Sequence, residues 1–142
     1  GGGKKDKPSY QDVCLGTTNH VELVKVVYLD KKINLSSILK IFWESHNPTQ
    51  GMRQGNDVGT QYRSAIYTTT SEQLKMAEKS FNIYSSQINK KFTNKITTEI
   101  MPLPNFFYAE DYHQQYLAKN PDGYCGLNGL GIEFNQNDLL DI

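Results

Sequence analysis

Apolar and polar residues follow one another in this chain in patterns that predict three strands and three helices. Segments rich in β-branched residues are expected as strands over 21–29, 61–68 and 96–100. Apolar residues at helical spacing predict helices over 35–44, 70–92 and 109–118. Asn34 is a suitable N-cap for the first helix, and Thr70 to Gln73 fits a capping box for the second. The order β-α-β-α-β predicts an α+β fold, an α/β two-layer sandwich.

The length of 142 residues fits a single domain over 1–142. Residues 1–8 are rich in Gly and Lys and are expected to be a flexible start. Residues 135–142 are mostly polar and are expected to be a frayed tail. Residues 45–60 predict a long ordered loop, and loops of that length within a compact domain usually carry function.

Composition excludes several classes of function. The chain has 15 basic and 15 acidic residues, so it has no net positive field to attract nucleic acid. The apolar segment 21–29 contains Glu22 and Lys25 and is far shorter than the ~20 residues of a membrane span. The two cysteines form no Cys-x-x-Cys pair, so neither a disulfide scaffold nor a metal site is expected.

Both arginines lie close together in the polar loop region. Arg53 and Arg63 are the only two arginines among the 15 basic residues. The stretch between them consists almost entirely of glycine and residues with hydrogen-bonding side chains. A guanidinium is a planar fork with five donors, suited to several oxygens at once. Two interpretations stay open: a loop held by its own hydrogen bonds, or a binding site.

Glu22 and Cys125 are the residues whose chemistry is least explained by packing. Glu22 is either a solvent-facing strand residue or a carboxyl in an apolar pocket with a raised pKa, able to act as an acid. Cys125 lies in a run containing Gly123, Gly126 and Gly129, and a thiol on such a permissive segment suits thiol–disulfide exchange. Cys14 is interpreted as a structural cysteine.

Several motifs closely resemble those of the peptide methionine sulfoxide reductases of type A. They stand in the order of that family and cover about residues 1–132 of the chain. They are Pro8-Ser9-Tyr10 with Val13-Cys14, Gly16-Thr17-Thr18 with His20-Val21-Glu22, Phe42-Trp43-Glu44 with His46-Asn47-Pro48-Thr49-Gln50, the run Gly51 to Tyr67, Ile96 to Ile100, Tyr108 to Leu117, and Lys119-Asn120-Pro121 with Gly123-Tyr124-Cys125-Gly126.

The resemblance implies a ferredoxin-like core and an enzyme that reduces the S epimer of methionine sulfoxide, free or in proteins, to methionine. A cysteine attacks the sulfoxide sulfur, and a second cysteine converts the resulting sulfenic acid into a disulfide. Thioredoxin or another dithiol then reduces that disulfide, and no other cofactor is implied. The resemblance implies these roles: Glu22 as the acid, Tyr10 and Tyr62 as hydroxyl donors, Asp57 as an ordering carboxylate, Cys125 as the resolving thiol, and Tyr62, His113, Tyr116 and Tyr124 as substrate contacts.

The chain departs from the family pattern at one point. The family's nucleophilic cysteine lies in a Gly-Cys-Phe-Trp motif, which is absent from these 142 residues. We expect an N-terminally truncated form of a working reductase, inactive without that segment. The alternative is an inactive fragment or pseudo-enzyme that binds oxidised methionine or a thioredoxin-like partner. A monomer in the cytoplasm or an organelle is expected, with no nucleic-acid or membrane partner.

Overall fold

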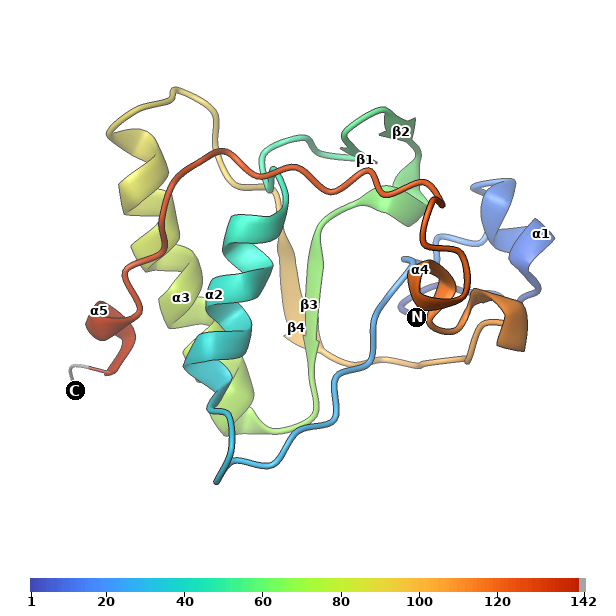
Figure 1. Ribbon diagram of the computed structural model, residues 1–142, viewed down its shortest axis with the longest axis horizontal. Helices are drawn as coiled ribbons and strands as arrows, with labels where there is room; N and C mark the ends of the chain where they lie inside the picture. Colours follow the sequence, from blue (N-terminus) through green and yellow to red (C-terminus); the bar gives the residue numbers. More distant parts are fainter. Residues whose placement is uncertain (141–142) are drawn as a thin grey trace.

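The computed structural model describes residues 1–140 of the protein (Figure 1). The two long helices are α2 (Leu35–Ser45) and α3 (Ser71–Asn89), and the longest strands are β3 (Ala65–Thr68) and β4 (Glu99–Pro102). The shorter elements are α1 (Tyr10–Cys14), β1 (Arg53–Gln54), β2 (Asp57–Val58), η1 (Thr60–Tyr62), η2 (Asp111–His113), α4 (Tyr116–Lys119) and α5 (Asn137–Leu140).

Strands β3 and β4 form a parallel pair, with Ala65 opposite Glu99 and Thr68 opposite Pro102. Helix α3 connects them and packs against both strands, while α2 packs beside α3. Figure 1 shows the two helices together on one side of the pair. The arrangement confirms the predicted α+β class, with a helical layer on a small sheet.

The core lies between α2, α3 and the C-terminal segment. Trp43 is fully buried and donates a hydrogen bond from Nε1 to Oγ of Ser80 at 2.9 Å. Tyr84 and Phe134 are buried beside it, with ring centroids 6.1 Å apart. The predicted helices over 35–44 and 70–92 are confirmed, and Asn34 caps α2 as expected. Only half of the expected capping box forms at α3, because Thr70 accepts from Gln73 N while the Gln73 side chain accepts from Thr69 N.

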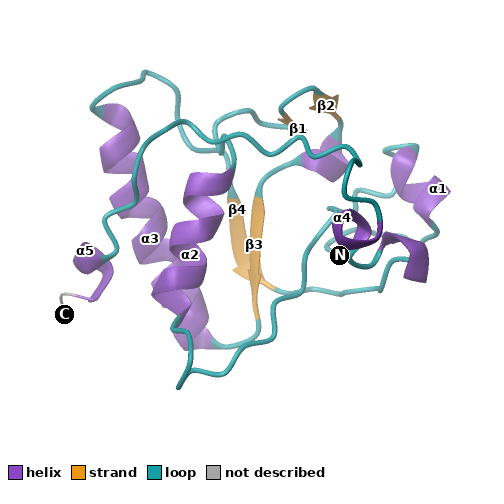
Figure 2. Cartoon of the chain, in the orientation of Figure 1, coloured by secondary structure: helices purple, strands orange, loops and turns teal. Residues whose placement is uncertain are grey.

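The predicted strand over 21–29 is wrong. This segment forms no strand and runs as a loop toward α2 (Figure 2). Val24 and Val27 are 88% and 83% exposed, so their β-branched side chains have no packing surface. Strand propensity depends on packing against neighbouring strands, and β3 and β4 pair only with each other among the described residues.

Other boundaries also differ from the predictions. The strand expected over 96–100 is β4, Glu99–Pro102, and the helix expected to reach residue 92 ends at Asn89. The strand expected over 61–68 begins only at Ala65, because Thr60–Tyr62 turns as η1. The loop over 45–60 contains a tight hairpin, β1–β2. The helix expected over 109–118 is divided into η2 and α4, since Gln115 adopts a left-handed conformation with φ of 51°.

The two ends of the chain are more ordered than expected. Within the predicted flexible start 1–8, the backbone N–H groups of Gly2 and Gly3 donate to Asn105 and His20 at 2.6 and 2.9 Å. Within the predicted polar tail 135–142, Leu139 in α5 is 1% exposed and belongs to the core. A frayed tail would leave this apolar side chain in water. Residues 141 and 142 of that prediction lie outside the described residues.

Leu139→Ala is expected to lower the free energy of unfolding by about 2–5 kcal/mol, because a buried leucine is lost from a close-packed core. Its neighbour Leu140 is 52% exposed, so Leu140→Ala serves as the matched control and should change stability by less than about 0.5 kcal/mol. Urea denaturation of both variants measures the difference. Equal effects would show that α5 is not part of the core.

Candidate functional site

Tyr10 is the first residue of the short helix α1, which a capping box holds in place. Ser9 Oγ accepts from Asp12 N at 3.2 Å, and Asp12 Oδ2 accepts from Ser9 N at 2.8 Å. Tyr10 N in turn donates to Glu110 Oε1 at 3.1 Å. The Tyr10 ring lies against His113, with centroids 4.3 Å apart. Two segments far apart in sequence therefore meet around this phenol.

Tyr62 and Glu22 are brought together by one backbone hydrogen bond. Glu22 N donates to the carbonyl of Gln61, next to Tyr62, at 3.0 Å. The η1 turn that carries Tyr62 is held by Arg63, whose Nη1 donates to Thr60 O at 2.8 Å. Gln61 is buried, and its Nε2 donates to Cys14 O at 3.3 Å. These contacts join α1, η1 and the segment around Glu22.

Asp57 enters from the β1–β2 hairpin. Gly55 has a positive φ of 56° at the turn, and both Arg53 Nε and Nη2 donate to its carbonyl, at 3.0 and 2.6 Å. The side chain of Tyr124 reaches this hairpin and donates to Asp57 Oδ2 at 3.4 Å. The loop that carries Cys125 thus lies over the hairpin. Arg53 and Arg63 both hold loop carbonyls, which supports the first interpretation of the arginine-rich region.

Glu22 interacts electrostatically with two other charged or ionisable side chains of the site, Asp57 and His113. Partial desolvation by the surrounding protein raises its pKa above the ordinary value, although the side chain keeps contact with solvent. The Asp57 carboxylate raises the pKa of Glu22 further, while His113 opposes the shift. A carboxyl with a raised pKa holds its proton to higher pH and can donate it. Glu22 is at the same time an exposed residue, so it combines a solvent-facing position with a pKa shifted in the direction that an acid role requires.

The two phenols of the site also resist ionisation. The adjacent Cys14 side chain is the main cause that raises the pKa of Tyr10 to about 12, and Glu22 and Tyr62 add to it. Desolvation raises the pKa of Tyr62, with further contributions from Glu22 and Asp57. Both hydroxyls therefore stay protonated and neutral at physiological pH. The site presents neutral O–H donors, and these suit an uncharged oxygen acceptor.

His113 packs against the Tyr10 ring. Its Nε2 lies 3.7 Å from Glu110 Oε2, and both atoms are buried without a hydrogen-bond partner. The same carboxyl group holds Tyr10 N through its other oxygen. His113 and Glu110 are thus positioned to set the orientation of the Tyr10 ring.

The structure brings together Tyr10, Glu22, Asp57, Tyr62, His113 and Tyr124 among the predicted site residues. Cys125 is exposed and unpaired, next to Tyr124. Tyr116 stands at the start of α4, with its ring against Gly123. Sequence reasoning missed two features, the closeness of Cys14 to Tyr10 and Tyr62 and the support from Glu110. The four-residue spacing between Tyr10 and Cys14, one helical turn, is the signal that could have indicated the first.

Comparison with known proteins identifies the family. The model of the peptide methionine sulfoxide reductase family matches residues 1–136, and the chain belongs to that family. The peptide methionine sulfoxide reductase MsrA of Rhodospirillum centenum is 57% identical over 131 residues, which are 92% of this chain and 60% of that protein. That of Rippkaea orientalis is 59% identical over 125 residues, 88% of this chain and 58% of that protein. The chain therefore spans about three fifths of these relatives.

Solved structures give the same result for the fold. Methionine sulfoxide reductase A of Corynebacterium diphtheriae superimposes with a TM-score of 0.82 at 45% identity, covering 87% of this chain and 62% of that one. Reduced Mxr1 from Saccharomyces cerevisiae has a TM-score of 0.74 at 42% identity, covering 83% and 63%. Within residues 1–140, no helix is both long and apolar enough to cross a membrane.

The raised pKa of Glu22 predicts a pH-dependent stability difference. A carboxyl whose folded-state pKa lies above its unfolded value of 4.5 favours folding when protonated. That contribution is fully present below pH 4.5 and is lost as the pH rises through the raised value. Glu22→Gln should therefore unfold at a higher urea concentration than the parent at neutral pH and at the same concentration near pH 4. Glu78→Gln, an exposed carboxyl on α3, is the control. A constant difference across pH would contradict the shift.

Proposed function

We propose that the whole protein to which this chain belongs is a peptide-methionine (S)-S-oxide reductase, and that this chain supplies its acid, its hydroxyl donors and its resolving thiol. One observation carries the proposal. Glu22, with its raised pKa, interacts electrostatically with Tyr10, Asp57 and His113, from three other segments of the chain. Family membership supports the reaction, because the relatives are named for the reduction of methionine sulfoxide.

The chemistry of a sulfoxide fits this set of donors. Its oxygen is a strong neutral acceptor, so the hydroxyls of Tyr10 and Tyr62 can donate to it without a buried cation. Glu22 in its protonated form donates a proton to that oxygen as the sulfur is attacked, which is general acid catalysis. Asp57 contributes by raising the pKa of Glu22. His113 and Tyr124 border the same region, and they are proposed as substrate contacts together with Tyr62 and Tyr116.

The thiol steps require two cysteines. A nucleophilic thiolate attacks the sulfoxide sulfur, methionine leaves, and the cysteine becomes a sulfenic acid. Cys125 then condenses with the sulfenic acid, forming an S–S bond and releasing water. Thioredoxin or another dithiol reduces the disulfide. We assign the nucleophile to the Gly-Cys-Phe-Trp motif, absent from the 142 residues.

We also propose that the protein acts as a monomer in the cytoplasm.

The 142-residue chain is expected to show no turnover of methionine sulfoxide with dithiothreitol or thioredoxin, because neither cysteine is the assigned nucleophile. Measuring methionine release under saturating reductant tests this. Turnover at a measurable rate would reject the assignment. Cys14→Ser would then be the first variant to examine, since Cys14 lies closest to the hydroxyl donors.

Fusing an upstream segment that carries Gly-Cys-Phe-Trp ahead of Gly1 is expected to give an active reductase. In that fused protein Glu22→Gln should lower kcat by about 10²–10⁴-fold, the usual range for loss of a general acid. Glu78→Gln on α3 is the matched control and should leave kcat unchanged. An active fusion that is insensitive to Glu22→Gln would remove Glu22 from the acid role. A correctly folded but inactive fusion would favour the binding-only alternative.

A further inference from the structure

The resolving thiol lies in a short loop between two fixed parts of the chain. On one side of the loop, Gly123 N donates to Asn120 O at 2.9 Å. On the other side, Gly129 lies directly on the end of α2, because a Cβ at this position would collide with Glu44 O. The five residues 124–128 between these points form neither a helix nor a strand. The position of the thiol therefore depends on what holds these five residues.

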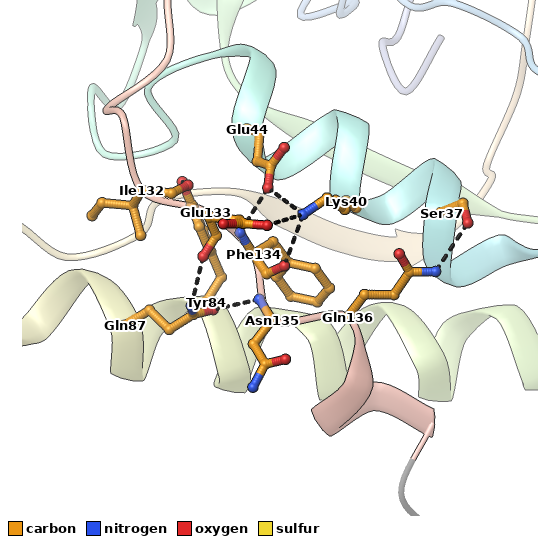
Figure 3. Close-up of polar contacts among 10 residues, drawn as sticks. All are labelled: Ser37, Lys40, Glu44, Tyr84, Gln87, Ile132, Glu133, Phe134, Asn135 and Gln136. Atoms are coloured by element: carbon orange, nitrogen blue, oxygen red, sulfur yellow. Dashed lines mark hydrogen bonds and ion pairs between the residues drawn. The ribbon is translucent and has the colours of Figure 1, made fainter.

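The chain beyond this loop is fixed between α2 and α3 (Figure 3). Tyr84 of α3 donates to Ile132 O at 3.1 Å, and both residues are buried. Glu44 of α2 accepts from Phe134 N at 2.8 Å, and Lys40 donates to Phe134 O at 3.2 Å. The C-terminal side of the loop thus has a firm attachment, and a contact that controls the thiol has to lie within the loop itself.

The loop lies on the β1–β2 hairpin. In the part of the chain that the structure describes, its one hydrogen bond runs from Tyr124 Oη to Asp57 Oδ2 at 3.4 Å. Gly126 O lies against the turn of the same hairpin, 3.3 Å from where a Cβ of Gly55 would stand. The loop therefore contacts the hairpin through Tyr124 and Gly126, the two neighbours of Cys125 in the sequence.

The side chain of Tyr124 can reach Asp57 because residue 126 is a glycine. A Cβ at Gly126 would lie 2.5 Å from Tyr124 Oη and 3.0 Å from its Cζ. Gly126 does not have a positive φ, so glycine is needed here for space and not for its backbone conformation. A side chain at position 126 would push the phenol away from the carboxylate.

We propose that Tyr124 is a positioning residue for the resolving thiol, and that its hydrogen bond to Asp57 keeps the Cys125 loop docked, which means in contact with the β1–β2 hairpin. This inference rests on the proposed function, in which the Cys125 thiol attacks a sulfenic acid, forms the S–S bond and releases water. Asp57 also interacts electrostatically with Glu22. Docking on the hairpin therefore keeps the thiol near the acid of the site.

The strength of this hydrogen bond sets the size of the expected effect. The bond is long and Tyr124 is 63% exposed, so its contribution lies at the low end of the usual range. A contribution of that size changes the ratio of docked to undocked loop by about 2–5-fold. Docking is thus reversible, which suits a thiol that reacts first with a sulfenic acid and then with an external reductant.

Nuclear magnetic resonance relaxation of the Cys125 amide tests the proposal on the 142-residue chain. Tyr124→Phe removes only the hydroxyl and should raise the population of the undocked loop by about 2–5-fold. Asp57→Ala should have the same effect, and the double variant should show no larger effect than either single variant, because both remove one interaction. Asn128→Ala, at an exposed position of the same loop, is the matched control and should leave the population unchanged.

Gly126→Ala reaches the same state by another route, because the added methyl group displaces the phenol while both partners remain. It should shift the ring resonances of Tyr124 and also raise the undocked population. An unchanged population in Tyr124→Phe would overturn the proposal. Effects of Tyr124→Phe and Asp57→Ala that add up in the double variant would do the same, because the two side chains would then act independently.

These measurements do not depend on catalysis, so failure of the reductase assignment is seen separately, as an inactive fusion. In an active fusion, Gly126→Ala should slow disulfide formation relative to sulfenic acid formation by up to about 5-fold. Disulfide formation at the parental rate from an undocked loop would overturn the positioning role, because the contact would then serve only the fold.

Discussion

The guanidinium of Arg63 is the contact on which the arrangement of the site depends. It is 9% exposed, and its five N–H groups reach four different segments. It donates to Thr60 O at 2.8 Å and to Asn19 O at 3.2 Å, and it pairs with Glu99 at 3.4 Å. Tyr67 shares the same carboxylate. One side chain therefore joins the η1 turn, the segment before Glu22 and the two strands, which a lysine with a single nitrogen could not do.

The chemistry of the site follows from this arrangement. Because η1 is fixed, Gln61 can accept the N–H of Glu22, and the carboxyl is held beside Tyr62 and Asp57. Desolvation and the Asp57 carboxylate raise the pKa of Glu22, desolvation with Glu22 and Asp57 raises that of Tyr62, and Cys14 is the main cause for Tyr10. The site thus presents two neutral hydroxyl donors beside a carboxyl whose pKa is shifted toward retention of its proton. Donors of this kind suit an uncharged oxygen acceptor.

Local sequence signals predicted the two long helices well and the strand at 21–29 badly, for a physical reason. Asn34, Thr70 and the apolar stripe of α3 act within their own helix, so their effect can be predicted without the partner surface. Val24 and Val27 need neighbouring strands, and their propensity alone forms nothing. The polar composition of 135–142 concealed Leu139, one apolar residue in a position to reach the core.

The site itself was predictable through motifs and only partly through residue chemistry. The resemblance selected Tyr10, Glu22, Asp57 and Tyr62, which the structure brings together. The support of Tyr10 by Glu110, a hundred residues away, has no local signal. The contacts of Lys40 and Gln87 with the C-terminal segment have no local signal either, because both are ordinary surface-type residues until that segment lies between them.

The proposed set of donors for a sulfoxide oxygen, the Tyr10 and Tyr62 hydroxyls with the protonated form of Glu22, can be tested on this chain without catalysis. Nuclear magnetic resonance titration with N-acetylmethionine sulfoxide, with N-acetylmethionine as the control ligand, measures binding at these residues over a range of pH. The account predicts shifts at all three residues with the sulfoxide alone, and weaker binding as the pH rises through the raised pKa of Glu22. Equal binding of both ligands, or affinity that does not change as Glu22 ionises, would contradict it.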